Sequence, residues 1–126
     1  MSADTPIIEL QDVEVTFNSR TGSLFRPHKV HAVRGVNMRI ERGQTLGIVG
    51  ESGCGKSTTA NVMCGLQMAT KGKVFFNGEE VTKRGADARR RIGRVVSVVF
   101  QDPATALNPR MHVADQLADP LRVHGI

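Results

Sequence analysis

One octapeptide constrains the fold of this chain more than any other stretch. Residues 50–57 read Gly-Glu-Ser-Gly-Cys-Gly-Lys-Ser, after the apolar run 45–49 and before a segment that can form a helix. The apolar run lacks polar alternation, which is typical of a strand covered on both faces in a parallel sheet. Glycines in the turn let backbone amides point inward at an anion, and the free amides that begin a helix strengthen the attraction. The pattern therefore predicts an α/β fold with a phosphate-binding loop.

Two residues of the loop have specific chemical tasks. Lys56 is long enough to reach the β- and γ-phosphates of a nucleotide, and the hydroxyl of Ser57 can ligate Mg²⁺. The alternative is a glycine-rich turn with an incidental lysine. The position of the loop between a buried-type strand and a helix disfavours that alternative.

Alternation and turn signals predict the elements around the loop. Residues 8–17 alternate in polarity with a slip of phase at residues 11 and 12, so we expect two short strand pieces joined at a turn or bulge. Asn77 and Gly78 between apolar residues form the strongest hairpin signal of the chain. The other predicted elements are a loop at 18–29, strands at 36–40, 45–49 and 95–100, a helix from about 55 to 64 ended by Gly65, a helix at 86–92, and a helix with Val113, Leu117 and Leu121 on one face that Pro120 interrupts.

Size and cysteine content limit the class of protein. At 126 residues the chain is one domain at most, and such a domain buries roughly two thirds of the surface that its unfolded chain exposes. The sequence has no apolar run of about 20 residues and no secretory signal, so we expect a cytosolic chain. Cys54 and Cys64 lack the spacing of a disulfide framework or a metal site and are expected to be reduced.

Cys54 lies just before the predicted helix, a position that tends to make a thiol more reactive. We therefore hypothesise that Cys54 is sensitive to alkylation and that bound nucleotide shields it. The alternative is an inert small residue that fills the loop.

Positive charge gathers between two apolar segments. The net charge is +5, and such a basic cluster could contact nucleic acid. The chain has no Trp or Tyr, and its five Phe residues do not alternate with the basic ones, so a stacking platform for single strands is not evident. We therefore interpret the cluster as a solvated face and expect no nucleic-acid partner. Its members are Lys83, Arg84, Arg89, Arg90, Arg91 and Arg94.

The residues around the loop carry a family resemblance. Residues 50–58, preceded by Ala-Val-Arg-Gly-Val at 32–36 and Gly-Gln-Thr-Leu-Gly-Ile-Val at 43–49, closely resemble the ATP-binding subunit of ATP-binding-cassette (ABC) transporters. Residues 72–78 look like that family's hairpin after the first helix, and residues 98–103 look like its glutamine loop. The resemblance covers nearly the whole chain.

A narrower resemblance concerns the type of transporter. The run 101–110, followed by Met-His-Val at 111–113 and Ala-Asp-Pro-Leu at 118–121, is similar to the dipeptide, oligopeptide and nickel importers. Cys54 and the insertion that holds Leu24 and Phe25 look more like the second of the two ATPase subunits of such systems. Peptide as the cargo follows from this resemblance alone.

The resemblance implies a partial ABC-type nucleotide-binding domain over residues 1–126, with the fold of a P-loop NTPase. We expect an incomplete mixed sheet with an antiparallel β-subdomain, a phosphate loop at 50–57, a glutamine loop near residue 101 and the start of a helical subdomain at 104–126. The implied cofactors are ATP and Mg²⁺, with Ser57 and Gln101 at the metal. The residues implied to bind them are Gly50, Glu51, Ser52, Gly53, Cys54, Gly55, Lys56, Ser57, Thr58 and Gln101.

Partners follow from the same resemblance. Gln101 is similar to the residue that senses Mg²⁺ and the γ-phosphate and couples the site to the membrane subunits. The implied partners are transmembrane permease subunits and a second ATPase subunit, with the chain peripheral on the cytoplasmic face of the cell membrane. The family usually stacks an aromatic side chain on adenine, and residues 27–31 hold no Tyr or Trp, which leaves Phe25 and His31 as substitutes.

Several family features are not found before Ile126: the signature sequence, the acidic strand with the catalytic glutamate, and the switch histidine. Phosphoryl transfer needs a residue that orients the attacking water, so we expect ATP binding without hydrolysis by this chain alone and assign no catalytic residue. We also expect a truncated chain that is poorly soluble or partly unfolded, because buried-type strands lack partners. The alternatives are a non-hydrolysing nucleotide-binding or interaction module and a P-loop kinase of another family.

Overall fold

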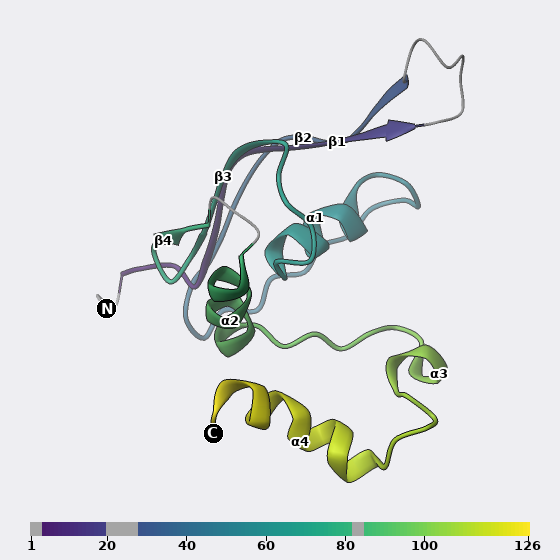
Figure 1. Cartoon of the computed structure of the whole chain (residues 1–126). Helices are drawn as coiled ribbons and strands as arrows, with labels where there is room; N and C mark the ends of the chain where they lie inside the picture. The colour runs from purple at the N-terminus through teal and green to yellow at the C-terminus, as the bar shows by residue number, and fades with distance from the viewer. Residues whose placement is uncertain (1–3, 20–27, 82–84) are drawn as a thin grey trace.

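Two long strands carry the sheet on which the rest of the molecule is built. In the computed structural model, which describes residues 4–19, 28–81 and 85–126, β1 (Ile8–Ser19) pairs antiparallel with β2 (His28–Ile40). The other edge of β1 pairs antiparallel with β3 (Lys71–Phe76), which turns back into the short strand β4 (Glu79–Glu80). The sheet order is β2-β1-β3-β4, so β1 is hydrogen-bonded on both sides (Figure 1).

A bulge in β1 decides which side chains face the core. Side chains alternate between the two faces of a strand, so Leu10 and Val13 would point to opposite sides of a regular one. Asp12 has a φ of 47°, and the pairing register with β2 shifts between Leu10 and Val13. The extra residue restores the phase, and Leu10, Val13 and Val15 are all at most 1% exposed. The predicted slip at residues 11 and 12 is confirmed as a bulge.

Both neighbouring strands hold this bulge in place. The backbone amide of Asp12 donates to Asn37 Oδ1 of β2 at 3.0 Å, and Asn37 Nδ2 donates to Asp12 Oδ1 at 2.8 Å. On β3, Gly72 has a φ of 83° and lies so close that a Cβ atom there would be 2.3 Å from the Asp12 carbonyl oxygen. Residue 72 therefore disfavours any side chain, because its φ is positive and because a Cβ atom would collide with the Asp12 carbonyl.

β3 and β4 form the hairpin that the sequence predicts. Both turn residues have positive φ, 50° for Asn77 and 79° for Gly78, as a type I′ turn requires. The amide of Val81 donates to the carbonyl of Val74 at 2.8 Å and closes the hairpin beyond β4. The hairpin prediction is confirmed.

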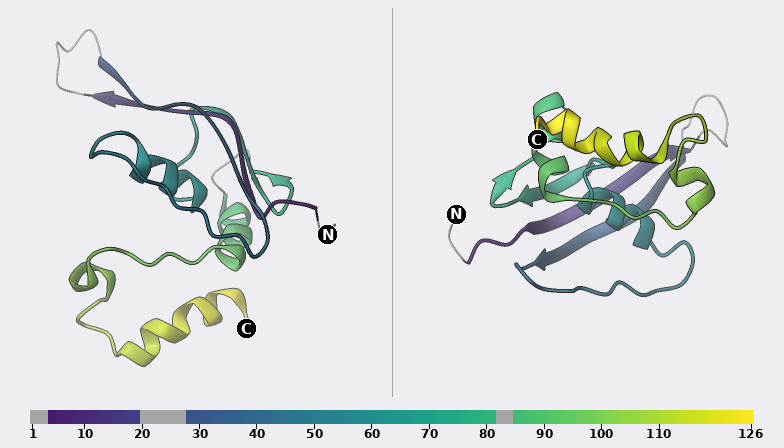
Figure 2. Two further views of the ribbon diagram at one scale, coloured as in Figure 1. Left: turned by 180° about the vertical axis from the view of Figure 1, so that it is seen from behind. Right: turned by 90° about the horizontal axis from the view of Figure 1, so that it is seen from below.

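Two helices, α1 (Lys56–Met63) and α2 (Ala86–Val95), cover one face of the sheet and close the core (Figure 2). α1 ends as predicted, since Gly65 has a φ of 72° and its amide donates to the Val62 carbonyl at 3.1 Å. α2 places Ala88 and Ile92 on its buried side. The core cluster comprises Leu10, Val13, Val15, Val33, Val62, Met63, Val74, Phe76 and Ile92.

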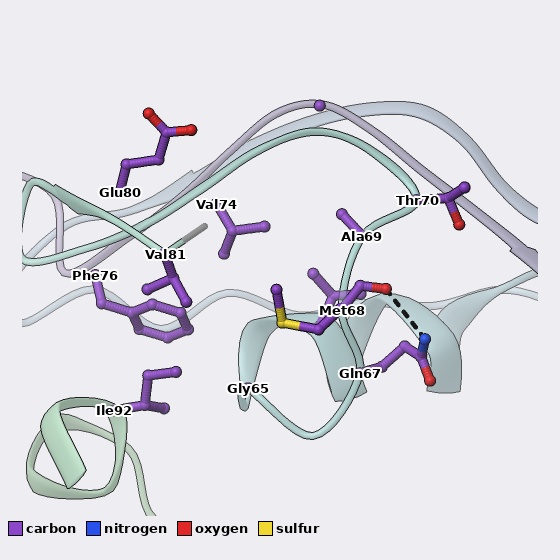
Figure 3. Close-up of a pocket in the computed structure, with 12 residues that line it drawn as sticks. Gly65, Gln67, Met68, Ala69, Thr70, Val74, Phe76, Glu80, Val81 and Ile92 are labelled. Atoms are coloured by element: carbon purple, nitrogen blue, oxygen red, sulfur yellow. Dashed lines mark hydrogen bonds between the residues drawn. The ribbon is translucent and has the colours of Figure 1, made fainter. Parts of the chain in front are cut away.

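A cavity of about 260 Å³ remains where the hairpin, α2 and the loop after α1 meet (Figure 3). Phe76 and Ile92 lie next to each other on its lower side in this view, and Gln67 donates to the carbonyl of Met68 at 3.0 Å. The cavity touches the C-terminal end of α1, through Val62 and Gly65. It is therefore separate from the predicted phosphate loop, which precedes the other end of that helix.

α3 (Pro103–Ala106) and α4 (Val113–His124) lie farther from the sheet than α1 (Figure 1). The prediction that Pro120 interrupts the last helix is wrong, because α4 continues through it to His124. The fixed φ of proline is itself helical, and this exposed helix loses the hydrogen bond of only one backbone amide. None of the helices in the described part of the chain is long and apolar enough to cross a bilayer.

Two segments predicted as buried strands form no strand. Residues 45–49 and 96–100 pair with nothing in the described part of the chain, and α2 extends through Val95, where the second strand is predicted to begin. Val49 is 93% exposed and Val99 is 96% exposed. Apolar composition favours burial, but a strand exists only through its ladder with a neighbour. The antiparallel part of the predicted sheet is confirmed, whereas its parallel part does not form among these residues.

Two strands reach into the segment that the sequence predicts as a loop at 18–29. Asn18 pairs with Lys29 and Ser19 with His28, so β1 and β2 extend into it from both ends, and residues 20–27 lie outside the described residues. β2 also begins before the predicted strand at 36–40. The far end of this two-stranded ribbon is largely exposed, so no alternation of polar and apolar residues marks it in the sequence.

Alanine at Gly72 is expected to destabilise the sheet more than alanine at Gly43. Both glycines have positive φ, 83° and 73°. Each variant therefore carries backbone strain of roughly 1–3 kcal/mol. The added Cβ at Gly72 also meets the Asp12 carbonyl, whereas at Gly43 it meets no atom within 4 Å. Urea unfolding followed by circular dichroism should give the lower midpoint for Gly72→Ala. Equal midpoints would show that the bulge does not need this close approach.

The unpaired apolar segments are expected to make the chain self-associate, because such segments pair with other chains. Val99→Lys should raise the monomer fraction in size-exclusion chromatography without changing the circular dichroism spectrum, since Val99 is 96% exposed. Val15→Lys, at a fully buried position, is the contrasting variant and should unfold the sheet. Unchanged association of Val99→Lys would exclude its segment as the cause.

Candidate phosphate-binding site

The C-terminal end of the predicted phosphate loop contacts β2 closely. Gly55 has a φ of 97°, and a Cβ atom there would lie 2.5 Å from the carbonyl oxygen of Ala32. At the other end of the loop, a Cβ atom on Gly50 would lie 2.6 Å from the Sγ atom of Cys54. Glycine at both ends thus lets the loop close on itself and rest on the strand.

α1 begins at this loop without a side-chain cap. The amide of Thr59 donates to the carbonyl of Gly55 at 2.9 Å, so the amides of Lys56, Ser57 and Thr58 precede the first helical hydrogen bond. The positive end of the helix dipole lies at the same place. An anion bound here would supply acceptors for these amides.

Lys56 folds back over the loop. Its Nζ atom donates to the carbonyl oxygens of Gly50 and Glu51, to the latter at 2.9 Å. Both acceptors are neutral, and none of the ion pairs found among the described residues includes Lys56. The ammonium charge is therefore not compensated by a carboxylate, and phosphate oxygens could replace the two carbonyls as its partners.

An open cavity of about 420 Å³ lies between the loop and β2. Loop residues 51–53 and 55–58 line one side, and Val30, His31 and Ala32 line the other. Its volume falls within the range of roughly 300–1,000 Å³ that is usual for ligand pockets. Sequence reasoning did not identify Val30 and Ala32, because it began the strand at residue 36. The family resemblance of residues 32–36 was the nearest signal to them.

His31 contributes an aromatic ring to the β2 side of this cavity. Its Nδ1 atom lies 3.3 Å from Oγ1 of Thr16 on β1, within hydrogen-bonding distance. Of the two substitutes considered for an adenine-stacking side chain, His31 is thus at the cavity wall. Phe25 lies outside the described residues.

Gln101 is not among the residues that line the cavity, whereas Ser57 is. Gln101 is exposed and lies between the irregular segment 96–100 and α3. Because that segment has no ladder partner, no strand holds its end beside the loop. A joint contact of Ser57 and Gln101 with Mg²⁺ stays a prediction.

The residues present fit a magnesium ion that arrives with its phosphates. In the described ranges, no group of three or more His, Cys, Asp or Glu side chains is arranged to hold a metal. Mg²⁺ in nucleotide sites is usually held by one or two protein oxygens together with substrate phosphates. Ser57, which lines the cavity, carries a hydroxyl oxygen of this kind.

The predicted basic cluster forms an exposed helix face where the structure describes it. Arg89, Arg90, Arg91 and Arg94 are exposed on α2, opposite the buried Ala88 and Ile92. Arg91 pairs with Glu79 of the hairpin at 2.5 Å. The interpretation of a solvated face is confirmed for these four arginines, whereas Lys83 and Arg84 lie outside the described residues.

Comparison with known families and proteins gives consistent results. A family model described as ABC transporter matches residues 33–124. The oligopeptide transport ATP-binding protein OppF of Salmonella typhimurium is 41% identical over 121 residues, which cover 94% of this chain and 36% of the relative. The di/tripeptide transport ATP-binding protein DppF of Pseudomonas aeruginosa is 45% identical over 102 residues, covering 80% of this chain and 32% of the relative. The chain spans about a third of the length of these curated relatives.

Solved structures share the fold. A dimeric bacterial ABC transporter cassette superposes with a TM-score of 0.74 at 24% identity, over 93% of this chain and 47% of the cassette. A cassette in a post-hydrolysis state bound to ADP and Pi gives the same values. The predicted fold class is confirmed by these neighbours.

The two cysteines allow a test of where a ligand lies. Cys54 is exposed in the loop, whereas Cys64 is half-buried and burial raises the pKa of its thiol, so less of it is thiolate at neutral pH. N-ethylmaleimide should therefore label Cys54 several-fold faster, as mass spectrometry of the peptides would show. ATP with Mg²⁺ should slow the labelling of Cys54 and leave that of Cys64 unchanged. Equal labelling of Cys54 with and without ATP would contradict a ligand over the loop.

Proposed function

The chain belongs to the ABC transporter family, and on this basis we propose that residues 50–58 bind the phosphates of ATP together with Mg²⁺. The observation that carries the proposal is the position of Lys56. Its charged group lies over a loop whose neighbouring helix begins with amides that lack helical acceptors. Family membership indicates the class of ligand, and this geometry provides its donors.

Each part of the site has a role in this proposal. The amides of residues 56–58 donate to phosphate oxygens, and Lys56 exchanges its two carbonyl partners for oxygens of the β- and γ-phosphates. The Ser57 hydroxyl holds the Mg²⁺ that accompanies the phosphates. His31 faces the same cavity from β2 and is the ring available to the adenine.

We further propose that the protein is an ATPase subunit of a peptide importer. The relatives named above are ATP-binding proteins of oligopeptide and di/tripeptide transport, which supports peptides as the cargo. The partners would be transmembrane permease subunits and a second ATPase subunit, with the chain peripheral on the cytoplasmic face of the membrane. Residues 104–126 would begin the helical subdomain that meets the permease, and Gln101 would couple it to the nucleotide.

This chain alone is proposed to bind ATP without turning it over. Hydrolysis requires a residue that orients the attacking water. We assign this role to none of residues 1–126. A non-hydrolysing nucleotide-binding or interaction module is the second candidate function. The two candidates share the binding site and differ in whether the chain works within a hydrolysing assembly.

Lys56→Ala is expected to raise the Kd for ATP with Mg²⁺ at least about tenfold, since a hydrogen bond to a charged group contributes about 1.5–3 kcal/mol. Isothermal titration calorimetry would measure this change. Lys73→Ala is the matched control, because it removes the same charge from an exposed position on β3. Its Kd should stay within about twofold of wild type, as expected for an exposed charge.

Turnover is measured separately, as phosphate release at saturating ATP. Release that requires added permease and partner ATPase subunits would support the importer subunit, and binding with no release in any assembly would support the module. An unchanged Kd in Lys56→Ala would exclude the loop as the ATP site.

A further inference from the structure

The C-terminal end of α4 contacts α2 through a histidine. The views agree that the last turn of α4 lies beside α2 (Figures 1 and 2). His124 is half-buried there, whereas residues 121–123 are exposed. The guanidinium group of Arg94 on α2 donates to the carbonyl oxygen of His124 at 3.4 Å. His124 therefore belongs to the contact between these two helices.

Gly93 of α2 provides the space for the ring of this histidine. A Cβ atom at Gly93 would lie 3.0 Å from Nε2 and 3.2 Å from Cε1 of His124, closer than ordinary van der Waals contact. Gly93 lies inside α2, where glycine stabilises a helix less than alanine does. The close approach of the imidazole ring gives a physical reason for a glycine at this position.

The other ring nitrogen of His124 has no hydrogen-bond partner. Its Nδ1 atom is buried, and no polar group in the described part of the chain reaches it. In a neutral imidazole this nitrogen can be the acceptor, with the proton on Nε2. In the charged ring it becomes a buried donor without an acceptor, which is more costly. The docked position of the ring therefore favours its neutral form.

Cationic side chains of α2 add to this preference. Arg94 lies at the carbonyl of His124. Arg89 and Arg90 are exposed one helical turn before Gly93, on the same side of α2. A proton on the ring would add a positive charge beside this basic surface, and like charges repel.

The carboxylates of this region do not offset that charge. None of the ion pairs found among the described residues includes His124. Glu79 of the hairpin is paired with Arg91, and Asp87 lies in the first turn of α2, far from Gly93. The C-terminal end of α4 attracts a cationic histidine equally in the docked and released states, so it does not change the balance. The same holds for the acidic groups that move with the ring, which are Asp115, Asp119 and the carboxyl group of Ile126.

We propose that His124 and Gly93 form a pH-sensitive latch between α4 and α2. The latch is closed while the imidazole is neutral and opens when the ring gains a proton, because water can hydrate both nitrogens of the released ring. The docked state then binds fewer protons than the released state, so docking weakens as the pH falls. Histidine changes its charge between about pH 8 and about pH 5, which sets the range of opening. The latch involves no nucleotide and is independent of the proposed function.

Two substitutions separate the charge of the ring from its packing. His124→Phe keeps an aromatic ring that cannot gain a proton, so α4 should stay docked in acid as well. Gly93→Ala adds the Cβ atom that meets the ring and should release α4 at every pH, while alanine favours α2 itself. His112→Gln is the matched control, because it removes an exposed histidine from the other end of α4, where the side chain makes no capping hydrogen bond.

The test is NMR spectroscopy of the full chain without nucleotide, at about pH 8 and about pH 5.5. The measured contact is the nuclear Overhauser cross-peak between the proton on Cε1 of His124 and an α-proton of Gly93. In the wild type and in His112→Gln, this cross-peak should be present at the higher pH and lost at the lower one. The corresponding ring cross-peak of His124→Phe should persist at both values, and the contact should be absent at both in Gly93→Ala.

Every other result would overturn the inference. A wild-type cross-peak that survives at the lower pH would show that the contact does not respond to protons. Its absence at the higher pH would show that α4 is not docked on α2. Loss of the contact in acidified His124→Phe would assign the release to other groups, and a contact retained in Gly93→Ala would show that the ring does not need this glycine.

Discussion

The bulge of β1 at Asp12 is the constraint on which the rest of the structure depends. β1 pairs with β2 on one edge and β3 on the other, and the extra residue brings Leu10, Val13 and Val15 to the same face. Helices α1 and α2 pack on that face. Because the bulge shifts the alternation of side chains, all three residues of β1 join the same core. The close approach of Gly72 to Asp12 shows that β3 is shaped to fit the same irregularity.

The loop at residues 50–57 is positioned by this core. α1 is held by Val62 and Met63 against the sheet, and Gly55 at its start rests on the Ala32 carbonyl of β2. The cavity beside the loop is consequently formed by two separate parts of the sequence, the loop itself and residues 30–32. The loop contributes free backbone amides and the ammonium group of Lys56, whereas the sheet contributes the opposite wall of the cavity, which includes His31.

The C-terminal part of the chain is built on a different physical basis. α3, the turn after it and α4 bury almost nothing, and side-chain hydrogen bonds to the backbone organise them. Segments 45–49 and 96–100 show the opposite case, with apolar side chains and no strand to pair with. Exposed apolar side chains of this kind are typical of contact surfaces.

Local chemistry was enough to predict several features from the sequence. The loop at 50–57, the Asn77 and Gly78 turn, the bulge at Asp12 and the end of α1 at Gly65 each follow from dihedral preferences or from a slip of alternation within a few residues. The same reasoning failed for the strands at 45–49 and 95–100, since a ladder depends on a partner that composition does not reveal. It failed again at Pro120, where the exposed helix tolerates one lost hydrogen bond. Only the tertiary structure decided that His31 lines the cavity and that Gln101 does not. It also decided that Gln116 of α4 bonds to the turn before that helix. Such placements depend on how distant parts of the chain pack, and no periodic pattern in the sequence reveals that packing.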